Sequence, residues 1–212
     1  MYQNLIFDWS GTLVDDMGPT LEATNAVFAI HGRSPLDRDE FRRLFRLPYS
    51  EFYEEHLPGI RLEDLEHHFR RAFAESQVPV TVLPHAREKL DWCRDNGIRC
   101  FVLTSMDRGT FELQLDELGM RHYFEATYSG VLDKREVIGG ILAQHQLALH
   151  QTAYLGDMIH DVVTAKHGGV SSVALLTGYT HREVLEACEP DWLMNDLLEF
   201  RTLMEQRTSS IS

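Results

Sequence analysis

The aspartate at position 8 ends an apolar run in the stretch from Leu5 to Asp15. Strand-forming residues lead up to it, and the chain then turns through the small residues Ser10, Gly11 and Thr12. Such a pattern presents a carboxylate at the end of a strand, where it can react. The alternative is a buried strand that ends in a turn, with the aspartate only capping the following segment. Both interpretations remain open on these residues alone.

Further polar residues follow later apolar runs. Thr104 and Ser105 come after residues 98–103, Lys134 opens a helical pattern, and Asp157 and Asp161 follow residues 152–155. Clustered carboxylates suit a hard divalent cation, and a site with few oxygen ligands suits magnesium. With a lysine and a hydroxyl, they are the parts expected for phosphoryl transfer, with Asp8 as a nucleophile that forms an aspartyl-phosphate. Alternatively, Asp157 and Asp161 are acidic first-turn residues favoured by a helix dipole.

The elements that must position these residues alternate between strand and helix. This order predicts an α/β fold with a doubly wound parallel sheet, in which ligands bind at the carboxyl ends of the strands. Asp8, Thr104, Lys134 and Asp157 each lie at or just after such an end, which favours a reactive site over simple capping. The predicted strands are 5–7, 98–103, 124–128, 152–155, 170–176 and 191–194, and the helices between them are 86–96, 110–118, 136–145 and a helix ending near residue 167.

Residues 16–78 interrupt this alternation with helical patterns only. Four helices are predicted there, at 20–32, 37–45, 49–56 and 62–75, separated by Gly and Pro signals. We therefore expect a small helical cap domain over residues 16–78, inserted into an α/β core domain formed by residues 1–15 and 79–212.

Composition limits the partners of the chain. It has 20 Lys and Arg against 33 Asp and Glu, for a formal charge of −13 over 212 residues. This charge repels polyanions, so we expect neither nucleic acid nor an anionic membrane as a partner. The sequence also lacks a signal-peptide pattern and a membrane-spanning apolar run, and its three cysteines suggest no disulfide framework, so a cytoplasmic protein is predicted.

The motifs together resemble the haloacid dehalogenase-like hydrolase superfamily, whose core is Rossmann-like. The segment from Asp8 to Thr12, then Thr104, Lys134 and the segment from Gly156 to Asp161 match its four ordered motifs. The helical insert resembles the small cap of the phosphoglycolate phosphatase and β-phosphoglucomutase branch. The resemblance implies Mg²⁺ held by Asp8, the carbonyl of Ser10 and Asp157, with Asp161 in support. It also implies a small phosphorylated substrate held by Thr104, Ser105 and Lys134.

Ser10 departs from the pattern, because the family's phosphatases carry a second aspartate there as general acid and base. General acid–base catalysis typically contributes about 10²–10⁴ in rate. A leaving group that needs little protonation, another proton donor or a persistent aspartyl-phosphate would each account for Ser10. His160, Asp15 and Asp16 are the candidate donors, although capping or hinge duty suits the two aspartates better.

Other activities must be weighed against a phosphatase. Phosphonoacetaldehyde hydrolase has a similar start, but it uses a cap lysine, and residues 16–78 contain none. The 2-haloacid dehalogenases need neither acid nor metal, but their last motif usually lacks the paired aspartates. A protein that binds a phosphorylated ligand without turnover is the third alternative.

Arg42, Arg43 and Arg46 form a cationic group in the predicted cap. Arg43 and Arg46 are expected to bind a second anionic group of the substrate, since arginine suits bidentate contacts. The alternative is a solvated helix face paired with nearby glutamates. The sequence does not name the substrate, and both a monomer and a homodimer are compatible with it.

Overall fold

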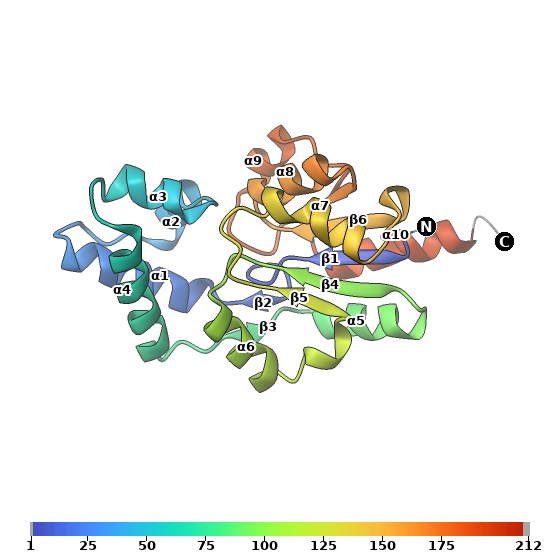
Figure 1. Cartoon of the computed structure of the whole chain (residues 1–212), viewed down its shortest axis with the longest axis horizontal. Coiled ribbons are helices and arrows are strands. Elements are labelled where there is room, and N and C mark those ends of the chain that lie inside the picture. The colour runs from blue at the N-terminus through green and yellow to red at the C-terminus, as the bar shows by residue number, and fades with distance from the viewer. Residues whose placement is uncertain (1, 210–212) are drawn as a thin grey trace.

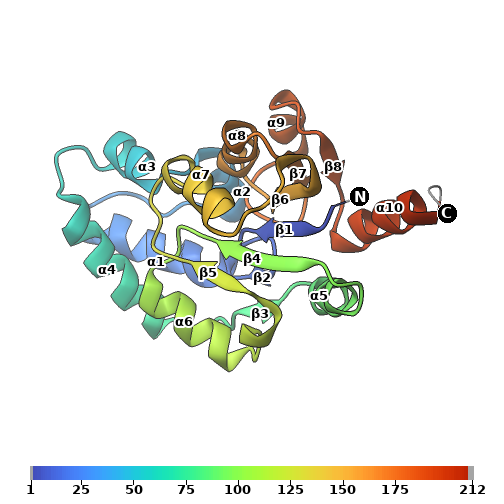
Figure 2. The same cartoon turned by 45° about the vertical axis from the view of Figure 1, so that its right-hand side comes forward.

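The computed structural model describes residues 2–209 and has a six-stranded parallel sheet at its centre (Figures 1 and 2). β1 lies in the middle of the sheet, with β4 and β6 as its neighbours, and the strand order is β5-β4-β1-β6-β7-β8. This confirms the predicted doubly wound α/β fold. The strands are β1 (Asn4–Phe7), β4 (Arg99–Leu103), β5 (Ala126–Tyr128), β6 (Thr152–Gly156), β7 (Ser171–Leu175) and β8 (Trp192–Met194).

The order of the strands explains where the polar residues meet. From β1 the chain first adds β4 and β5 on one side of the sheet and then β6, β7 and β8 on the other side. The strand order therefore reverses at β1. Phe7 pairs with Val102 of β4 and with Leu155 of β6. The residues that follow these three strands therefore emerge side by side at one edge of the sheet.

Successive residues of a strand point to opposite faces of the sheet, so both faces carry apolar side chains. Helices cover both faces and bury these side chains. Leu5 and Phe7 pack with residues of α5, α6 and α10, whereas Ile6 packs with residues of α7 and α8. The helices of the core are α5 (Ala86–Asp95), α6 (Arg108–Glu117), α7 (Arg135–Gln144), α8 (Ile159–Gly168), α9 (Arg182–Ala187) and α10 (Leu197–Ser209). Short 3₁₀ turns, η1 (Arg121–Tyr123) and η2 (Leu149–Gln151), precede β5 and β6.

Four further helices lie beside the carboxyl edge of the sheet (Figure 1). They have their own apolar cluster, which contains Phe28 of α1, Phe52 of α3 and Leu65 of α4. A two-stranded antiparallel ribbon of β2 (Val14–Asp15) and β3 (Thr81–Val82) joins the chain entering this segment to the chain leaving it. The helices are α1 (Met17–Ile30), α2 (Arg38–Leu44), α3 (Tyr49–His56) and α4 (Leu62–Glu75).

Two helices of the core were not predicted from the sequence, α9 and α10. The short strand β2 was also missed, because two residues are too few for an alternating pattern to be recognised. No helix within residues 2–209 has the length and apolar character that crossing a bilayer requires.

Candidate active site

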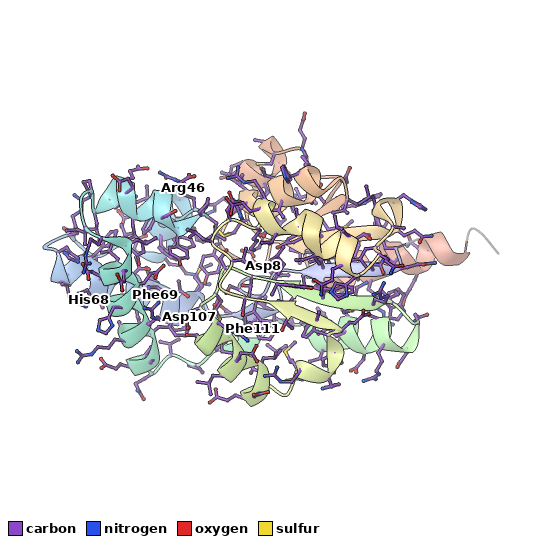
Figure 3. All side chains as sticks on the ribbon, in the orientation of Figure 1. Asp8, Arg46, His68, Phe69, Asp107 and Phe111 are labelled. Atoms are coloured by element: carbon purple, nitrogen blue, oxygen red, sulfur yellow. The ribbon has the colours of Figure 1, made fainter. Side chains whose placement is uncertain are left out.

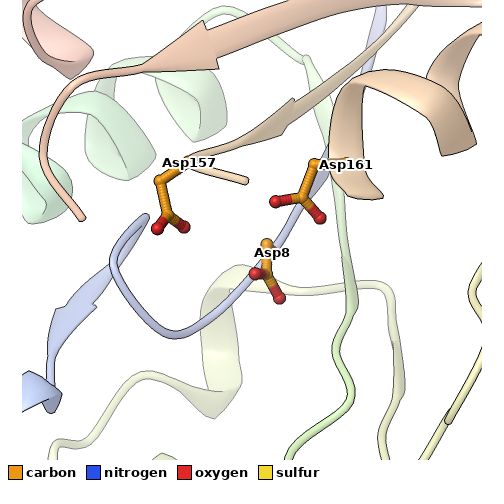
Figure 4. Close-up of side chains that lie close together, drawn as sticks. All are labelled: Asp8, Asp157 and Asp161. Carbon is orange, nitrogen blue, oxygen red and sulfur yellow. The ribbon is translucent and has the colours of Figure 1, made fainter. Parts of the chain in front are cut away.

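Three aspartates meet at the carboxyl edge of the sheet. Asp8 follows β1, Asp157 follows β6, and Asp161 lies in the first turn of α8. One carboxylate oxygen from each lies within 4.8 Å of the other two, and all three residues are buried. Figure 4 shows the three side chains close together, each brought by a separate segment of the chain. The sequence prediction that distant acidic residues converge on one place is thus met by the geometry.

Lys134 supplies the positive charge of this cluster. It is fully buried at the N-terminal end of α7, and its Nζ lies 2.9 Å from Asp8 Oδ1 and 2.7 Å from Asp161 Oδ1. The backbone N–H of Lys134 donates to Nε2 of His160, 3.1 Å away. His160 is buried, its Nε2 accepts this bond, and it is not among the described residues that line the cavity beside Asp8.

Burial and mutual repulsion act on the ionisation of the cluster. Burial raises the pKa of Asp8, repulsion from Asp161 adds to this, and Lys134 opposes it. Burial raises the pKa of Asp157 well above its usual range, and the charges of Asp161 and Asp8 raise it further. For Lys134, burial lowers the pKa, but the two neighbouring carboxylates outweigh it and keep the amine protonated. The single ammonium group of Lys134 therefore does not balance the negative charge of three ionised carboxylates.

The residues present suit a divalent cation. The single ammonium group of Lys134 pairs with two of the three carboxylates, and all three are buried where water screens their repulsion poorly. An all-oxygen donor set of this kind is the chemistry that magnesium prefers. Asp157 is also held in place independently of a cation, since Thr12 Oγ1 donates to its Oδ1 at 3.1 Å and the Tyr179 N–H to its Oδ2 at 2.7 Å.

Glycines make the room that these carboxylates occupy. A Cβ at Gly178 would lie 2.0 Å from Asp157 Oδ2, and one at Gly11, where φ is +69°, would lie 2.4 Å from the same atom. A Cβ at Gly156 would lie 2.2 Å from Asp161 Cγ. Gly178 was not identified from the sequence, because a single glycine in a loop gives no local sign of what its backbone approaches.

Thr104 and Ser105 follow β4 and line the same cavity as Asp8. Thr104 is buried, and its backbone N–H donates to the carbonyl of Tyr128 in β5. Within the described part of the chain, the Ser105 Oγ is buried without a hydrogen-bond partner. It is therefore available to donate to a ligand beside Asp8.

Asp16 is the acidic residue whose role the sequence left open. It precedes α1, yet within residues 2–209 its carboxylate caps no helix N–H. The Ser10 hydroxyl donates to its Oδ2 at 2.6 Å, and the Tyr179 hydroxyl to its Oδ1 at 2.8 Å. Burial raises its pKa to about 6 against the lowering effect of these two hydrogen bonds. Asp15, by contrast, accepts from the Met17 N–H, which is the local duty expected of it.

A cavity of about 140 Å³ separates the carboxyl edge of the sheet from the four N-terminal helices. Asp8, Ser10, Asp16 and Thr104 line it from the side of the sheet. The opposite wall is largely aromatic and comes from α3, α4 and the segment between α2 and α3. Figure 3 shows Phe69 of α4 and Asp107, just before α6, on the side of Asp8 that faces this wall.

Arg43 and Arg46 are placed elsewhere. Both are partly exposed, Arg43 paired with Asp39 and Arg46 with Glu55, and neither belongs to the described residues that line the cavity. Arg42 donates to the carbonyl of Thr180 instead, which ties α2 to the loop after β7. The structure therefore corresponds to the alternative considered for this cluster, a solvated helix face. The helical periodicity could not show that the residues of α2 lie outside the described lining of the cavity.

The chain is similar in sequence to a known protein family and to named relatives. A family model described as haloacid dehalogenase-like hydrolase matches residues 5–175. The phosphoglycolate phosphatase of Synechococcus elongatus is 28% identical over 211 residues, which cover 96% of this chain and 100% of that protein. The phosphoglycolate phosphatase of Pseudomonas putida is 26% identical over 207 residues, covering 91% of this chain and 76% of that protein.

Solved structures show the same fold. A haloacid dehalogenase-like family hydrolase from Streptococcus pneumoniae superposes with a TM-score of 0.85 at 22% identity, covering 96% of this chain and 98% of that chain. A predicted phosphatase from Clostridium acetobutylicum superposes with a TM-score of 0.86 at 18% identity, covering 97% and 99%. At these identities the likeness concerns the fold alone.

Proposed function

The chain belongs to the haloacid dehalogenase-like hydrolases, and from this premise we propose that it is a magnesium-dependent phosphatase of small phosphorylated metabolites. The observation that carries the proposal is the convergence of Asp8, Asp157 and Asp161 at the carboxyl edge of the sheet, where Lys134 pairs with Asp8 and Asp161. The relatives named phosphoglycolate phosphatase support the same reaction class.

In the proposed reaction, a carboxylate oxygen of Asp8 attacks the phosphorus atom of a phosphate monoester. The bond between phosphorus and the alcohol oxygen breaks, and the alcohol leaves with a proton. Water then attacks the aspartyl-phosphate, which releases inorganic phosphate and restores Asp8. Lys134, Thr104 and the unpartnered hydroxyl of Ser105 would hold the phosphoryl oxygens. Positioning and neutralisation of charge account for most of the catalysis in such a transfer.

Magnesium would be held by Asp8, the backbone carbonyl of Ser10 and Asp157, with Asp161 supporting the set through Lys134 and the Met158 N–H. When bound, a divalent cation neutralises the charge of the phosphoryl group and of the carboxylates around it. Gly178 and Gly11 keep the space for Asp157 that this arrangement needs.

The missing aspartate at position 10 has a replacement in Asp16. Its carboxyl group lines the same cavity as Asp8 and is in direct contact with the Ser10 hydroxyl. We propose that Asp16 gives a proton to the departing alcohol oxygen and later takes one from the attacking water. Tyr179 would orient it through the hydrogen bond to Oδ1.

We further propose that residues 16–78 act as the cap and that residues 1–15 and 79–212 are the core domain. The ribbon of β2 and β3 lies where the chain passes between the two parts. The aromatic wall of the cavity comes from this helical segment, so it would exclude water from Asp8 and contact the alcohol portion of the substrate.

The test is phosphate release from a panel of phosphorylated metabolites, with magnesium and with a chelator. We expect turnover that requires magnesium and that Asp8→Asn abolishes, with far-ultraviolet circular dichroism showing that the variant folds. If Asp8→Asn keeps more than about one tenth of the activity, Asp8 is not the nucleophile. Halide release from a haloacid that survives chelation would indicate the dehalogenase-type reaction instead, and ligand binding without turnover would indicate a binding protein.

A further inference from the structure

The cavity in front of Asp8 ends in an aromatic surface. Five rings of the helical segment line it: Phe45, Tyr49, Tyr53, Phe69 and Phe73. Its volume of about 140 Å³ is close to that of the roughly 150 Å³ apolar cavities that take up benzene. The same volume extends to Asp8 and Thr104, so it has to hold the phosphoryl group together with an alcohol portion of at most about one ring.

The polar groups of this surface are already engaged with one another. The Tyr49 hydroxyl donates to Glu66 Oε1 at 2.6 Å. Arg70, the one lysine or arginine among the described residues that line the cavity, lies 3.4 Å from Glu66 and 3.8 Å from Asp107. Since two carboxylates already face this guanidinium, a third carboxylate brought by a substrate would meet a net negative charge.

The arginines that could have received a second anion are directed away. Arg46 pairs with Glu55 and Glu51, and Arg43 pairs with Asp39, at the surface of the helical segment. An anionic group within the cavity would thus lose its hydration without gaining a free cation. Such a burial is costly for a charged group and favourable for an apolar one.

On these grounds, and resting on the proposed phosphatase function, we infer that the substrate is a phosphate monoester of an uncharged, largely apolar alcohol of about one ring in size. The phosphoryl group lies beside Asp8, Thr104 and Lys134, and the alcohol portion lies against Phe69 and Phe73. The chain then differs in substrate from its relatives named phosphoglycolate phosphatase, because phosphoglycolate carries a carboxylate next to its phosphate.

The experiment compares three esters with the full chain in magnesium: benzyl phosphate, the same ester with a carboxylate on its ring, and 2-phosphoglycolate. The first two have similar leaving groups, so their difference reports on the added carboxylate, and the ester with a neutral carboxamide at the same ring position separates its charge from its bulk. We expect kcat/KM for benzyl phosphate to exceed both others by at least about tenfold. Phosphoethanolamine is included because the acidic residues of the wall could instead select an ammonium group.

Substitutions on α4 test where the alcohol portion of the substrate binds. Phe69→Ala should raise KM for benzyl phosphate several-fold with little change in kcat, since a contact made equally in the ground and transition states is lost. Phe69→Leu keeps the apolar bulk and serves if the alanine variant is unstable. His68→Ala is the matched control, because His68 neighbours Phe69 but contacts the ring of His31 instead (Figure 3).

The outcomes separate the two proposals. Equal or faster hydrolysis of phosphoglycolate would overturn the inference and leave the phosphatase function intact, and its selective loss in Arg70→Gln would assign the substrate carboxylate to Arg70. Faster hydrolysis of phosphoethanolamine than of benzyl phosphate would also overturn it. If the folded protein hydrolyses no phosphate ester, the proposed function fails, and the inference about its substrate fails with it.

Discussion

Ser10 and Asp16 form a hydrogen-bonded pair at the position where the family's phosphatases carry their second aspartate. The distance between Ser10 Oγ and Asp16 Oδ2 is 2.6 Å, and both residues line the cavity that contains Asp8. Under the proposed mechanism, the carboxyl group of Asp16 takes the part of the aspartate that position 10 lacks. What matters for proton transfer is reach to the reacting oxygen.

Asp16→Asn should reduce kcat for an alkyl phosphate by about 10²–10⁴, because the amide cannot protonate the leaving alkoxide. The loss should be much smaller for p-nitrophenyl phosphate, whose leaving group departs without a proton. Steady-state kinetics with both esters measure this difference. Asp15→Asn is the control, since Asp15 bonds only the local Met17 N–H among the contacts of the described chain. Equal losses with both esters would indicate a structural role for Asp16.

At the scale of elements, α5 and α10 meet on one face of the sheet through a buried lysine. Lys89 of α5 is fully buried, its Nζ donates to the sulfur of Met204 at 3.1 Å, and it lies 4.3 Å from the Trp92 ring and 4.8 Å from the Phe200 ring. Sulfur and aromatic faces compensate a desolvated charge only in part. Burial accordingly lowers the pKa of Lys89 to about 8.

The contact between α5 and α10 should therefore grow stronger with rising pH. Between about pH 8 and 10.5 the unfolded chain binds the lysine proton and the folded chain releases it, so this group's contribution to the free energy of unfolding rises across that window. The lowering corresponds to about 3 kcal/mol at roughly 1.4 kcal/mol per pH unit. Lys89→Met should be the more stable protein at pH 7, and its advantage should shrink above pH 8. Urea unfolding of both proteins at several pH values measures the difference, and an advantage that does not vary with pH would contradict the prediction.

For the molecule as a whole, the acidic cluster joins segments that are far apart in the chain. Asp8, Lys134, Asp157 and Asp161 belong to β1, α7, β6 and α8 or to the residues beside them, and each is buried. A cation bound there would hold these elements together only in the folded state. Its binding free energy would then add to the stability of the entire core.

Magnesium should accordingly raise the melting temperature of the protein, because its binding adds about 2.7 kcal/mol to the free energy of unfolding at a concentration one hundred times Kd. Asp157→Asn should abolish this response, because it removes one carboxylate of the set. Sodium chloride at matched ionic strength is needed as a control, since salt alone screens the charge of −13. A similar rise in the melting temperature of the wild type and of Asp157→Asn would show that magnesium acts by screening and not at this site. The melting temperatures are measured by thermal unfolding followed by circular dichroism.

Much of this protein could be predicted from local patterns. Apolar runs that end in Asp8, Thr104 and Asp157 predicted the strands of the sheet, and their alternation with helices predicted that these residues share one edge. Such inferences succeed because a buried parallel strand and a helix each impose a periodicity on their own residues. The same patterns gave no indication of α9 and α10.

Only the tertiary structure decided where several side chains point. Asp16 precedes a helix as a capping residue would, yet its carboxylate bonds Ser10 and Tyr179, which lies 163 positions away in the chain. Arg43 and Arg46 form surface pairs, and the aromatic wall of the cavity comes from helices whose inward faces the sequence could not identify. These directions depend on contacts between distant segments, which leave no periodic trace in the residues that make them.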